Sequence, residues 1–236
     1  MKNYILFALV VFSLNCIRTL ADQRSYVWTY QYMIMERGKA EIEQYTTFST
    51  PELGAMSSQT STELSLEAEI GMSEHFDFAV YQVFKQGKDG LKYDGFKLRE
   101  RFLFGEKGRF LVDPLVYFEY KGKPDFSSHS LELKLILAKD FGDLNISVNP
   151  YTEFEKEGAG EWEIVPKYAA GISYRIFEIL GLGLEGSGSK KGNYIGPTIT
   201  HGIKNIWVAA GAQFPVGYIK PGNPEFKVRA IIGLHL

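Results

Sequence analysis

Phe226-Lys-Val-Arg-Ala-Ile-Ile-Gly-Leu-His-Leu236, at the end of the chain, alternates between two kinds of side chain. Successive side chains of a strand point to opposite faces. The residues of one face are Phe226, Val228, Ala230, Ile232, Leu234 and Leu236. The other face carries Lys227, Arg229, Gly233 and His235. One face is therefore apolar throughout and the other tolerates water, which is the pattern of a strand with lipid outside and a polar interior behind it.

The same alternation recurs through the chain, for example over residues 63–72, 131–137 and 162–174. Counting back from Leu236 predicts about twelve strands, the first beginning near Lys39. The connections fall into two alternating classes. Short turns are predicted near residues 73–75, 105–109, 140–143, 175–179 and 202–205. Longer polar loops are predicted near residues 50–61, 86–93, 121–128, 156–161, 187–193 and 218–225.

In its terminal strand and its connections the chain resembles bacterial outer-membrane β-barrel proteins. Members of that family usually end in Phe, whereas this chain ends in Leu236. The resemblance implies an all-β fold: a closed, antiparallel, up-and-down transmembrane β-barrel of about twelve strands, with short periplasmic turns and longer external loops. It also implies location in the bacterial outer membrane, contact with its lipid, and recognition of the C-terminal strand by the outer-membrane assembly machinery. We expect a monomer.

The N-terminus predicts export. Residues 1–3 are short and basic, residues 4–14 are uncharged and apolar, and residues 19–21 (Thr-Leu-Ala) offer a small-residue cleavage site. We interpret residues 1–21 as a secretory signal peptide. The alternatives are an N-terminal helix and a lipoprotein signal that uses Cys16. Because Cys16 is the only cysteine of the chain, the mature protein would have no disulfide and no cysteine–metal site.

Residues 39–236 are assigned to a single barrel domain, which leaves residues 22–38 over. Within them, residues 25–36 (SYVWTYQYMIME) are strand-like, with Tyr26, Trp28, Tyr30 and Tyr32 on one side. A closed barrel with both ends in the periplasm cannot absorb one extra strand. We therefore predict an accessory segment that lies against or inside the periplasmic mouth of the barrel.

A soluble two-sheet sandwich would show the same local alternation, but three features favour a membrane barrel. The signal peptide predicts export, strands of about ten residues suit a tilted membrane crossing, and aromatic residues such as Tyr117, Phe118 and Tyr120 gather near strand ends as in membrane girdles. The chain has 236 residues, 45% hydrophobic residues and a net charge of -2. This composition gives no reason to expect a nucleic-acid partner, and no long apolar segment follows the signal.

If the apolar faces meet lipid, the opposite faces line a lumen of mixed charge. The predicted lumen-lining residues are Glu41, Glu43, Glu63, Glu67, Glu69, Lys97, Arg99, Arg101, Asp113, Glu119, Glu132, Lys134, Lys167, Lys227 and Arg229. One interpretation is a water-filled passage whose opposed acidic and basic walls orient polar solutes. The other is an internal salt-bridge network that fills the barrel. Both remain open because a twelve-stranded barrel is intermediate in width between side-chain-filled eight-stranded barrels and open porins.

No catalytic, cofactor-binding or metal-binding residue can be nominated. His129 lies between Ser128 and Ser130, which point to the opposite face of a strand, so the spacing is wrong for a His–Ser pair. The other histidines show no metal-ligand spacing, and residues 181–186 (GLGLEG) are followed by no helix that could hold a nucleotide. We predict a non-enzymatic channel or binding barrel for small polar solutes. The alternatives are a structural or surface barrel with a filled lumen and a soluble periplasmic lipocalin-like carrier.

Overall fold

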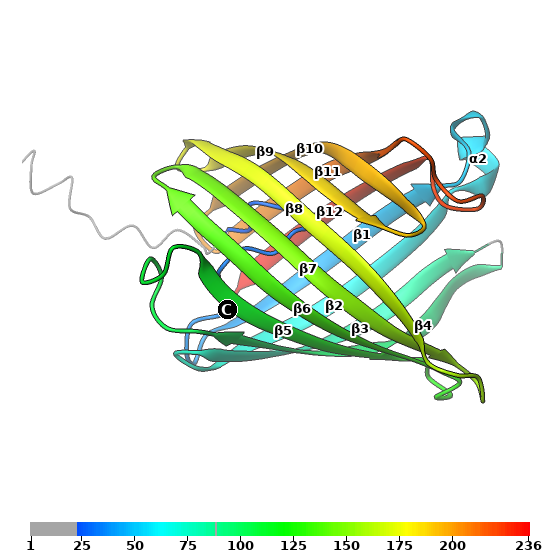
Figure 1. The fold of residues 1–236 in the computed structure, drawn as a ribbon, viewed down its shortest axis with the longest axis horizontal. Helices are drawn as coiled ribbons and strands as arrows, with labels where there is room; N and C mark the ends of the chain where they lie inside the picture. The colour runs from blue at the N-terminus through cyan, green and yellow to red at the C-terminus, as the bar shows by residue number, and fades with distance from the viewer. Residues whose placement is uncertain (1–22, 88) are drawn as a thin grey trace, which may run out of the picture.

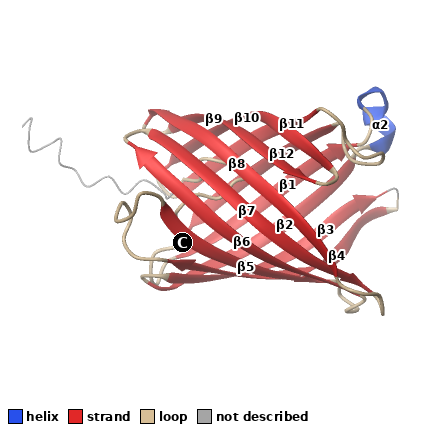
Figure 2. Ribbon diagram, viewed as in Figure 1, coloured by secondary structure: helices blue, strands red, loops and turns tan. Residues whose placement is uncertain are grey.

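A computed structural model describes residues 23–87 and 89–236, and in it the chain forms one closed antiparallel barrel (Figure 1). The predicted signal peptide and Cys16 lie outside the described residues. Each strand pairs with its neighbours in sequence, and β1 pairs with β12 to close the sheet, with Ile42 opposite Leu234 and Phe48 opposite Val228. Strands dominate the described structure (Figure 2). The predicted twelve-stranded up-and-down barrel is confirmed.

The strands are β1 (Ala40–Thr50), β2 (Ser61–Ser73), β3 (Phe76–Gly87), β4 (Gly90–Leu103), β5 (Asp113–Gly122), β6 (Ser128–Phe141), β7 (Leu144–Glu157), β8 (Glu163–Phe177), β9 (Leu180–Ser189), β10 (Gly192–Ile203), β11 (Ile206–Val216) and β12 (Phe226–His235). The connection after β1 holds a 3-10 turn, η1 (Leu53–Ala55), and a single helical turn, α2 (Met56–Gln59). Among the described residues, no helix is both long and apolar enough to span a bilayer.

The barrel is apolar outside and polar inside. Along β10, Ile195, Ile199 and Ile203 are 42%, 48% and 54% exposed, whereas Thr198 and Thr200 between them are buried. The other strands follow the same rule, so that large apolar residues lie on the exterior and most buried charged residues lie in the lumen. A soluble protein rarely exposes so continuous an apolar surface. The predicted faces, including that of the terminal strand, are therefore confirmed, and the two-sheet sandwich is not formed.

The two ends of the barrel differ. We call the end where β1 begins and β12 ends the turn end, and the opposite end the loop end. Two loop-end connections are shorter than predicted, because β3 runs to Gly87 before β4 starts at Gly90, and β9 runs to Ser189 before β10 starts at Gly192. The glycines at 90 and 192, which directly follow the two connecting residues, have φ of 103° and 149°, values that L side chains rarely adopt.

One turn-end connection is longer than predicted. Residues 104–112 separate β4 from β5, so Phe110 and Val112 lie outside the strand to which the alternation assigned them. The Gly108 N–H donates to the Asp113 carboxylate at 2.8 Å, and this bond closes the chain into a loop. The aromatic girdle needs one correction as well, because Tyr117 points into the lumen and is 2% exposed, while Phe118 lies on the exterior.

A positive charge on the exterior near the middle of a strand should destabilise the barrel in lipid. We expect Ile199→Arg to lower the free energy of unfolding by about 2–4 kcal/mol, the cost of Arg near the bilayer midplane of a β-barrel. The matched control is Leu111→Arg, because Leu111 is 91% exposed in the 104–112 connection. The measurement is guanidinium unfolding in phospholipid vesicles, followed by heat-modifiable gel migration. Equal losses in both variants would contradict the lipid-facing assignment.

Candidate functional site: a lumen occupied by the N-terminal segment

Residues 23–38 are here called the plug segment (Figure 1, dark blue). Residues 23–35 lie inside the barrel, and the exposed residues 36–38 lead to β1. The segment is irregular apart from a single bridge between Arg37 and Gly71 of β2. The strand-like pattern predicted for residues 25–36 therefore does not produce a strand. The lumen wall surrounds the segment, so consecutive residues such as Tyr26 and Val27 are both buried, each 1% exposed. Because the wall lies around the segment, its alternate residues do not separate into one buried face and one exposed face.

Glu185 of β9 holds the innermost part of the plug segment. Its carboxylate accepts backbone N–H groups from Val27 (2.7 Å), Trp28 (2.8 Å) and Thr29 (2.7 Å). The Thr198 hydroxyl donates to the same carboxylate at 2.5 Å. Glu185 is fully buried, and a buried charge is tolerated only when hydrogen bonds or an ion pair compensate its desolvation. Backbone donors of the segment thus take the place of a cation.

Small polar side chains of β7 hold the next part. Asn149 accepts the Tyr30 N–H at 2.6 Å and donates to the Tyr30 carbonyl at 2.9 Å. The Tyr26 hydroxyl donates to Asn145 at the start of β7 (2.8 Å), and the Tyr32 hydroxyl donates to the Gly105 carbonyl (2.7 Å). Residues 26 and 32 are thus tied near the turn end, while residues 27–30 are tied further inside. The plug segment enters from the turn end, turns within the lumen and returns to β1.

Glycines on the wall make room for the plug segment. A Cβ atom at Gly171 of β8 would lie 2.4 Å from the Tyr26 ring, and one at Gly211 of β11 would lie 2.7 Å from Val27 Cγ2. Both distances are shorter than van der Waals contact, so a larger side chain that is not bonded to the segment would force the Tyr26 or Val27 side chain to move. The segment can therefore approach the wall this closely only because glycine occupies these two positions.

A buried ion-pair network covers the wall formed by β2, β3 and β4. Arg99 contacts Glu67 at 2.6 Å and Glu69 at 2.7 Å, and Arg101 pairs with both Glu69 and Asp77. The predicted acidic and basic strands therefore do not face each other across the lumen. They flank β3, where the small residue Ala79 lies between Glu69 and Arg99 in the register, so that Arg99 can reach across it.

The network extends to β1 and the plug segment. Arg24 donates to Glu43 at 3.2 Å and to the Tyr45 hydroxyl at 2.6 Å, and that hydroxyl donates to Glu67 at 2.7 Å. Glu41 lies opposite Glu69 in the β1–β2 register but has no ion pair with Arg99 or Arg101, and it accepts a hydrogen bond from the Trp207 indole. The segment therefore contributes a cation to a cluster in which carboxylates would otherwise be in excess.

The remaining predicted lumen residues are distributed nearer the two ends. Toward the loop end, Lys97 pairs with Glu119 (3.0 Å), Lys134 with Glu132 (2.6 Å), Lys167 with Glu153 (2.5 Å) and Glu63 with Lys85 (3.9 Å). At the turn end, Asp113 lies 3.8 Å from Lys139. Lys227 and Arg229 contact aromatic rings instead of carboxylates. All of the predicted lumen residues are buried or half-buried in the structure.

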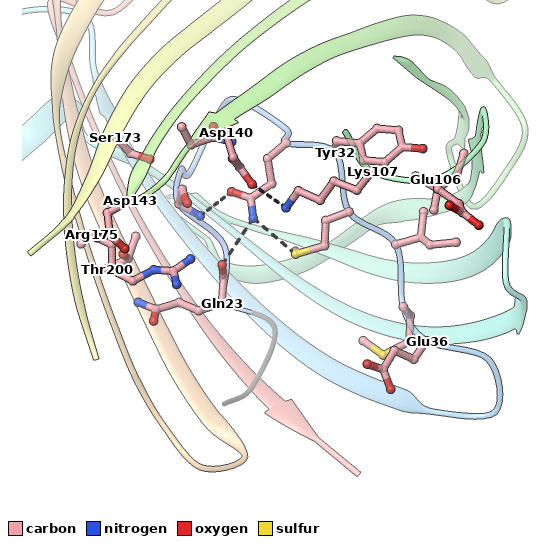
Figure 3. A pocket seen from close by; sticks show the side chains of 18 of the residues that line it. Gln23, Tyr32, Glu36, Glu106, Lys107, Asp140, Asp143, Ser173, Arg175 and Thr200 are labelled. Atoms are coloured by element: carbon pink, nitrogen blue, oxygen red, sulfur yellow. Dashed lines mark hydrogen bonds and ion pairs between the residues drawn. The ribbon is translucent and has the colours of Figure 1, made fainter. Parts of the chain in front are cut away.

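Two large cavities remain, one on each side of the plug segment. The turn-end cavity has a volume of about 960 Å³ and is lined by the outer part of the segment, including Gln23 and Tyr32, and by Lys107 and Asp140, which form an ion pair of 2.6 Å (Figure 3). The loop-end cavity has a volume of about 720 Å³ and is lined by Trp28 and Tyr30 of the segment and by the charged residues of the loop end. The segment therefore separates two polar vestibules.

No protein-family model matches the chain, and no curated protein matches its sequence. Solved structures do match. An outer membrane channel from Pseudomonas putida F1 aligns with a TM-score of 0.66 and 10% identity, over 89% of this chain and all of the channel. The KdgM porin aligns with a TM-score of 0.61 and 10% identity, over 82% of this chain and 98% of the porin. The NanC porin aligns with a TM-score of 0.57 and 7% identity, over 84% and 100%.

This chain has the fold of bacterial outer-membrane β-barrels. At these identities the likeness concerns the fold alone. Each of the three aligned proteins is covered over nearly its whole length, so the likeness extends over the complete barrel.

Groups considered for catalysis and metal binding are dispersed. His129 contacts the Tyr120 hydroxyl at 2.8 Å rather than a serine, and His235 lies 3.3 Å from Glu41. Among residues 23–87 and 89–236, no group of three or more His, Cys, Asp or Glu side chains could hold a metal ion.

Of the wall residues that hold the plug segment, the sequence predicted Glu43 and Arg229 as lumen-lining. Sequence reasoning did not single out five others, which are Glu185, Asn149, Ser147, Asn145 and Asp77. A signal was present for some of them. Glu185 is the only charged residue of β9, a strand otherwise made of glycine, leucine and serine. The inward positions of the first half of β7 carry small amides and a hydroxyl instead of charges. Amides that face a lumen suit a backbone, which offers both a donor and an acceptor.

Removal of the Glu185 carboxylate should loosen the plug segment. Cys16 lies in the predicted signal peptide, so Thr29→Cys provides a single labelling site, and Thr29 is 1% exposed. We expect maleimide labelling of this site to be at least about tenfold faster when Glu185→Ala is added, because one hydrogen bond to a charged group contributes about 1.5–3 kcal/mol. Glu153→Ala is the control, since Glu153 pairs with Lys167 of the wall. Equal rates in the two backgrounds would refute the anchoring role.

Loss of Arg99 should destabilise the barrel itself. Arg99→Met would leave the buried Glu67 and Glu69 without their shared cation, and we expect a loss of about 3–5 kcal/mol in the free energy of unfolding. Lys92→Met is the control, because Lys92 pairs with Asp89 on the exposed surface, where such pairs contribute little. Guanidinium unfolding in vesicles measures both variants. A loss for Arg99→Met no greater than that of the control would show that the network is dispensable.

Proposed function

We propose that this protein is a non-enzymatic barrel of the bacterial outer membrane through which small polar solutes pass when the plug segment leaves the lumen. The apolar exterior supports contact with lipid and argues against a soluble carrier, whose surface would be polar. The polar lumen supports passage of hydrophilic solutes. In this proposal the described structure is the closed state.

One observation carries the proposal: the plug segment, and not the wall, blocks the lumen. Every ion pair between two strands in the described part of the chain joins neighbouring strands or strands separated by one other, as Arg99 of β4 and Glu67 of β2 do. Such pairs line the wall and do not cross the lumen. The groups that cross it belong to the segment, which reaches Glu43 through Arg24 on one side and Glu185 through Val27 on the other.

The anchoring of the plug segment suits a reversible closure. Much of its attachment consists of hydrogen bonds to polar wall residues, which water can replace when the segment leaves. Two polar cavities already extend toward it from both ends. The second candidate, a structural barrel with a permanently filled lumen, is favoured by the burial of Val27 with Trp207, Ala209 and Ile231, because apolar packing opposes withdrawal.

A reversible lock separates these two functions. Val27 Cγ2 lies 2.7 Å from the place of a Cβ atom on Gly211, so Val27→Cys combined with Gly211→Cys places two thiols within disulfide range. We expect this double variant, in a Glu185→Ala background, to conduct ions in a planar bilayer when reduced and to close when oxidised. The Glu185→Ala variant without the cysteines is the control, and its conductance should not respond to the redox agent.

Deletion of residues 23–38 provides the second measurement. If solutes pass when the plug segment leaves, the folded deletion variant should conduct ions continuously in a planar bilayer. If that variant, shown to be folded by heat-modifiable migration, does not conduct, the lumen is closed by the wall and the structural function holds instead. Equal conductance in the oxidised and reduced forms of the double variant would likewise overturn the role of the plug segment.

A further inference from the structure

Two cations of the loop-end cavity have no carboxylate partner within the described part of the chain. Lys227 and Arg229 point inward from β12, about 6–7 Å apart along the strand. Their neighbours on the adjacent strands are uncharged: Lys227 pairs in register with Ser49 and Gln213, and Arg229 with Thr47 and Gly211. By contrast, Lys97, Lys134 and Lys85, which line the same cavity, each have an acidic partner within 3.1 Å.

Aromatic rings surround this pair of cations. Lys227 Nζ lies 3.7 Å from the centre of the Tyr194 ring and 5.7 Å from that of Trp28. The Arg229 guanidinium also lies 5.7 Å from the Trp28 ring. Trp28 lines the cavity, so an apolar ring surface and two positive charges are presented together.

Buried polar groups beside Lys227 lack partners. The Tyr194 hydroxyl and Gln213 Nε2 are buried and make no hydrogen bond to any described residue. The side chain of Gln213 is fixed, because its Oε1 accepts a bond from the Ser187 hydroxyl at 2.8 Å. Buried polar groups are nearly always hydrogen-bonded. Neither residue lines the loop-end cavity, so these two groups do not contact its contents, but they offer Lys227 no acceptor that would neutralise it. Lys227 and Arg229 themselves line the cavity, and their charge is therefore available to an anionic ligand.

We infer that the loop-end cavity binds a small organic carboxylate that carries a ring. Lys227 and Arg229 hold the carboxylate by charge-assisted hydrogen bonds, and the ring lies against Trp28. A volume of about 720 Å³ is within the range of small-molecule sites. Aromatic acids and sugar acids share the required chemistry. Such acids would be the solutes of the proposed channel. Only the claim that they are transported rests on the proposed function; their binding does not.

The site is coupled to the plug segment through two contacts. Trp28 belongs to the segment, and Arg229 Nη1 donates to the Val27 carbonyl at 3.3 Å. A carboxylate that engages Arg229 competes with this bond. Occupancy of the site and the position of the segment therefore affect each other.

Equilibrium binding to the full mature protein in detergent tests the inference. The probes are benzoate and glucuronate, with methyl benzoate and glucose as their uncharged counterparts, measured by calorimetry and by tryptophan fluorescence. We expect at least one acid to bind at least about tenfold more tightly than its counterpart, because a hydrogen bond to a charged group corresponds to about a tenfold change or more. The acid that binds more tightly identifies the ring chemistry.

Lys227→Gln should weaken binding of that acid at least about tenfold. The matched control is Lys85→Gln, which removes a charge from the same cavity at a lysine already paired with Asp94, and it should leave the affinity within about twofold. Lys227 donates no hydrogen bond to the described residues, so its replacement should leave heat-modifiable migration unchanged. Acids that bind no better than their uncharged counterparts, or equal affinities in the two variants, would overturn the inference.

The oxidised Val27→Cys, Gly211→Cys variant separates this inference from the proposed function. With the plug segment locked in place, the acid should still bind although conductance is absent. Binding without conductance in every form of the protein would overturn the proposed function alone. Conductance without binding would overturn this inference alone.

Discussion

Closure of the sheet between β1 and β12 is the constraint on which the rest of the structure depends. In lipid no water can pair with an exposed backbone, so a sheet must close on itself to satisfy its edges. Closure leaves each strand with one outer and one inner face. The outer face carries residues such as Ile199 and Ile232, and the inner face collects the charged residues that a soluble protein would expose.

The polar interior creates a second requirement, because buried charges need partners. The wall meets part of it through ion pairs within β2, β3 and β4. It leaves Glu185 without a basic partner in the structure, and the backbone of the plug segment supplies the missing donors. The segment thus supplies the hydrogen-bond donors that the Glu185 carboxylate does not find on the wall. Its departure would require water, or a solute, to take over those bonds.

Much of the fold could be predicted because strand alternation is a local property. The faces of β10 and β12 follow directly from their sequences, as does the number of strands. The connections at 86–93 and 187–193 were predicted too long, because their polar residues read as loops. In the structure most of these residues belong to the strands, which turn over two residues before Gly90 and Gly192. Tyr117 was wrongly assigned to a girdle, because it lies on the same inward face of β5 as Glu119, two residues further on, and only Phe118 between them faces outward. The partners of Lys227 could not be foreseen, because Tyr194 and Trp28 are distant in sequence.

The sequence by itself determined the two faces of each strand, the approximate strand count and the separation of charged from apolar faces, since each depends on a period of two residues within one strand. The predicted export signal and the strand length favoured a membrane barrel over a sandwich. Only the tertiary structure decided which charges meet and what fills the lumen. Arg99 reaches Glu67 because β2 and β4 flank the same strand, and Val27 meets Glu185 across 158 residues of sequence. Strand order, register and closure set such contacts, and no local pattern encodes them.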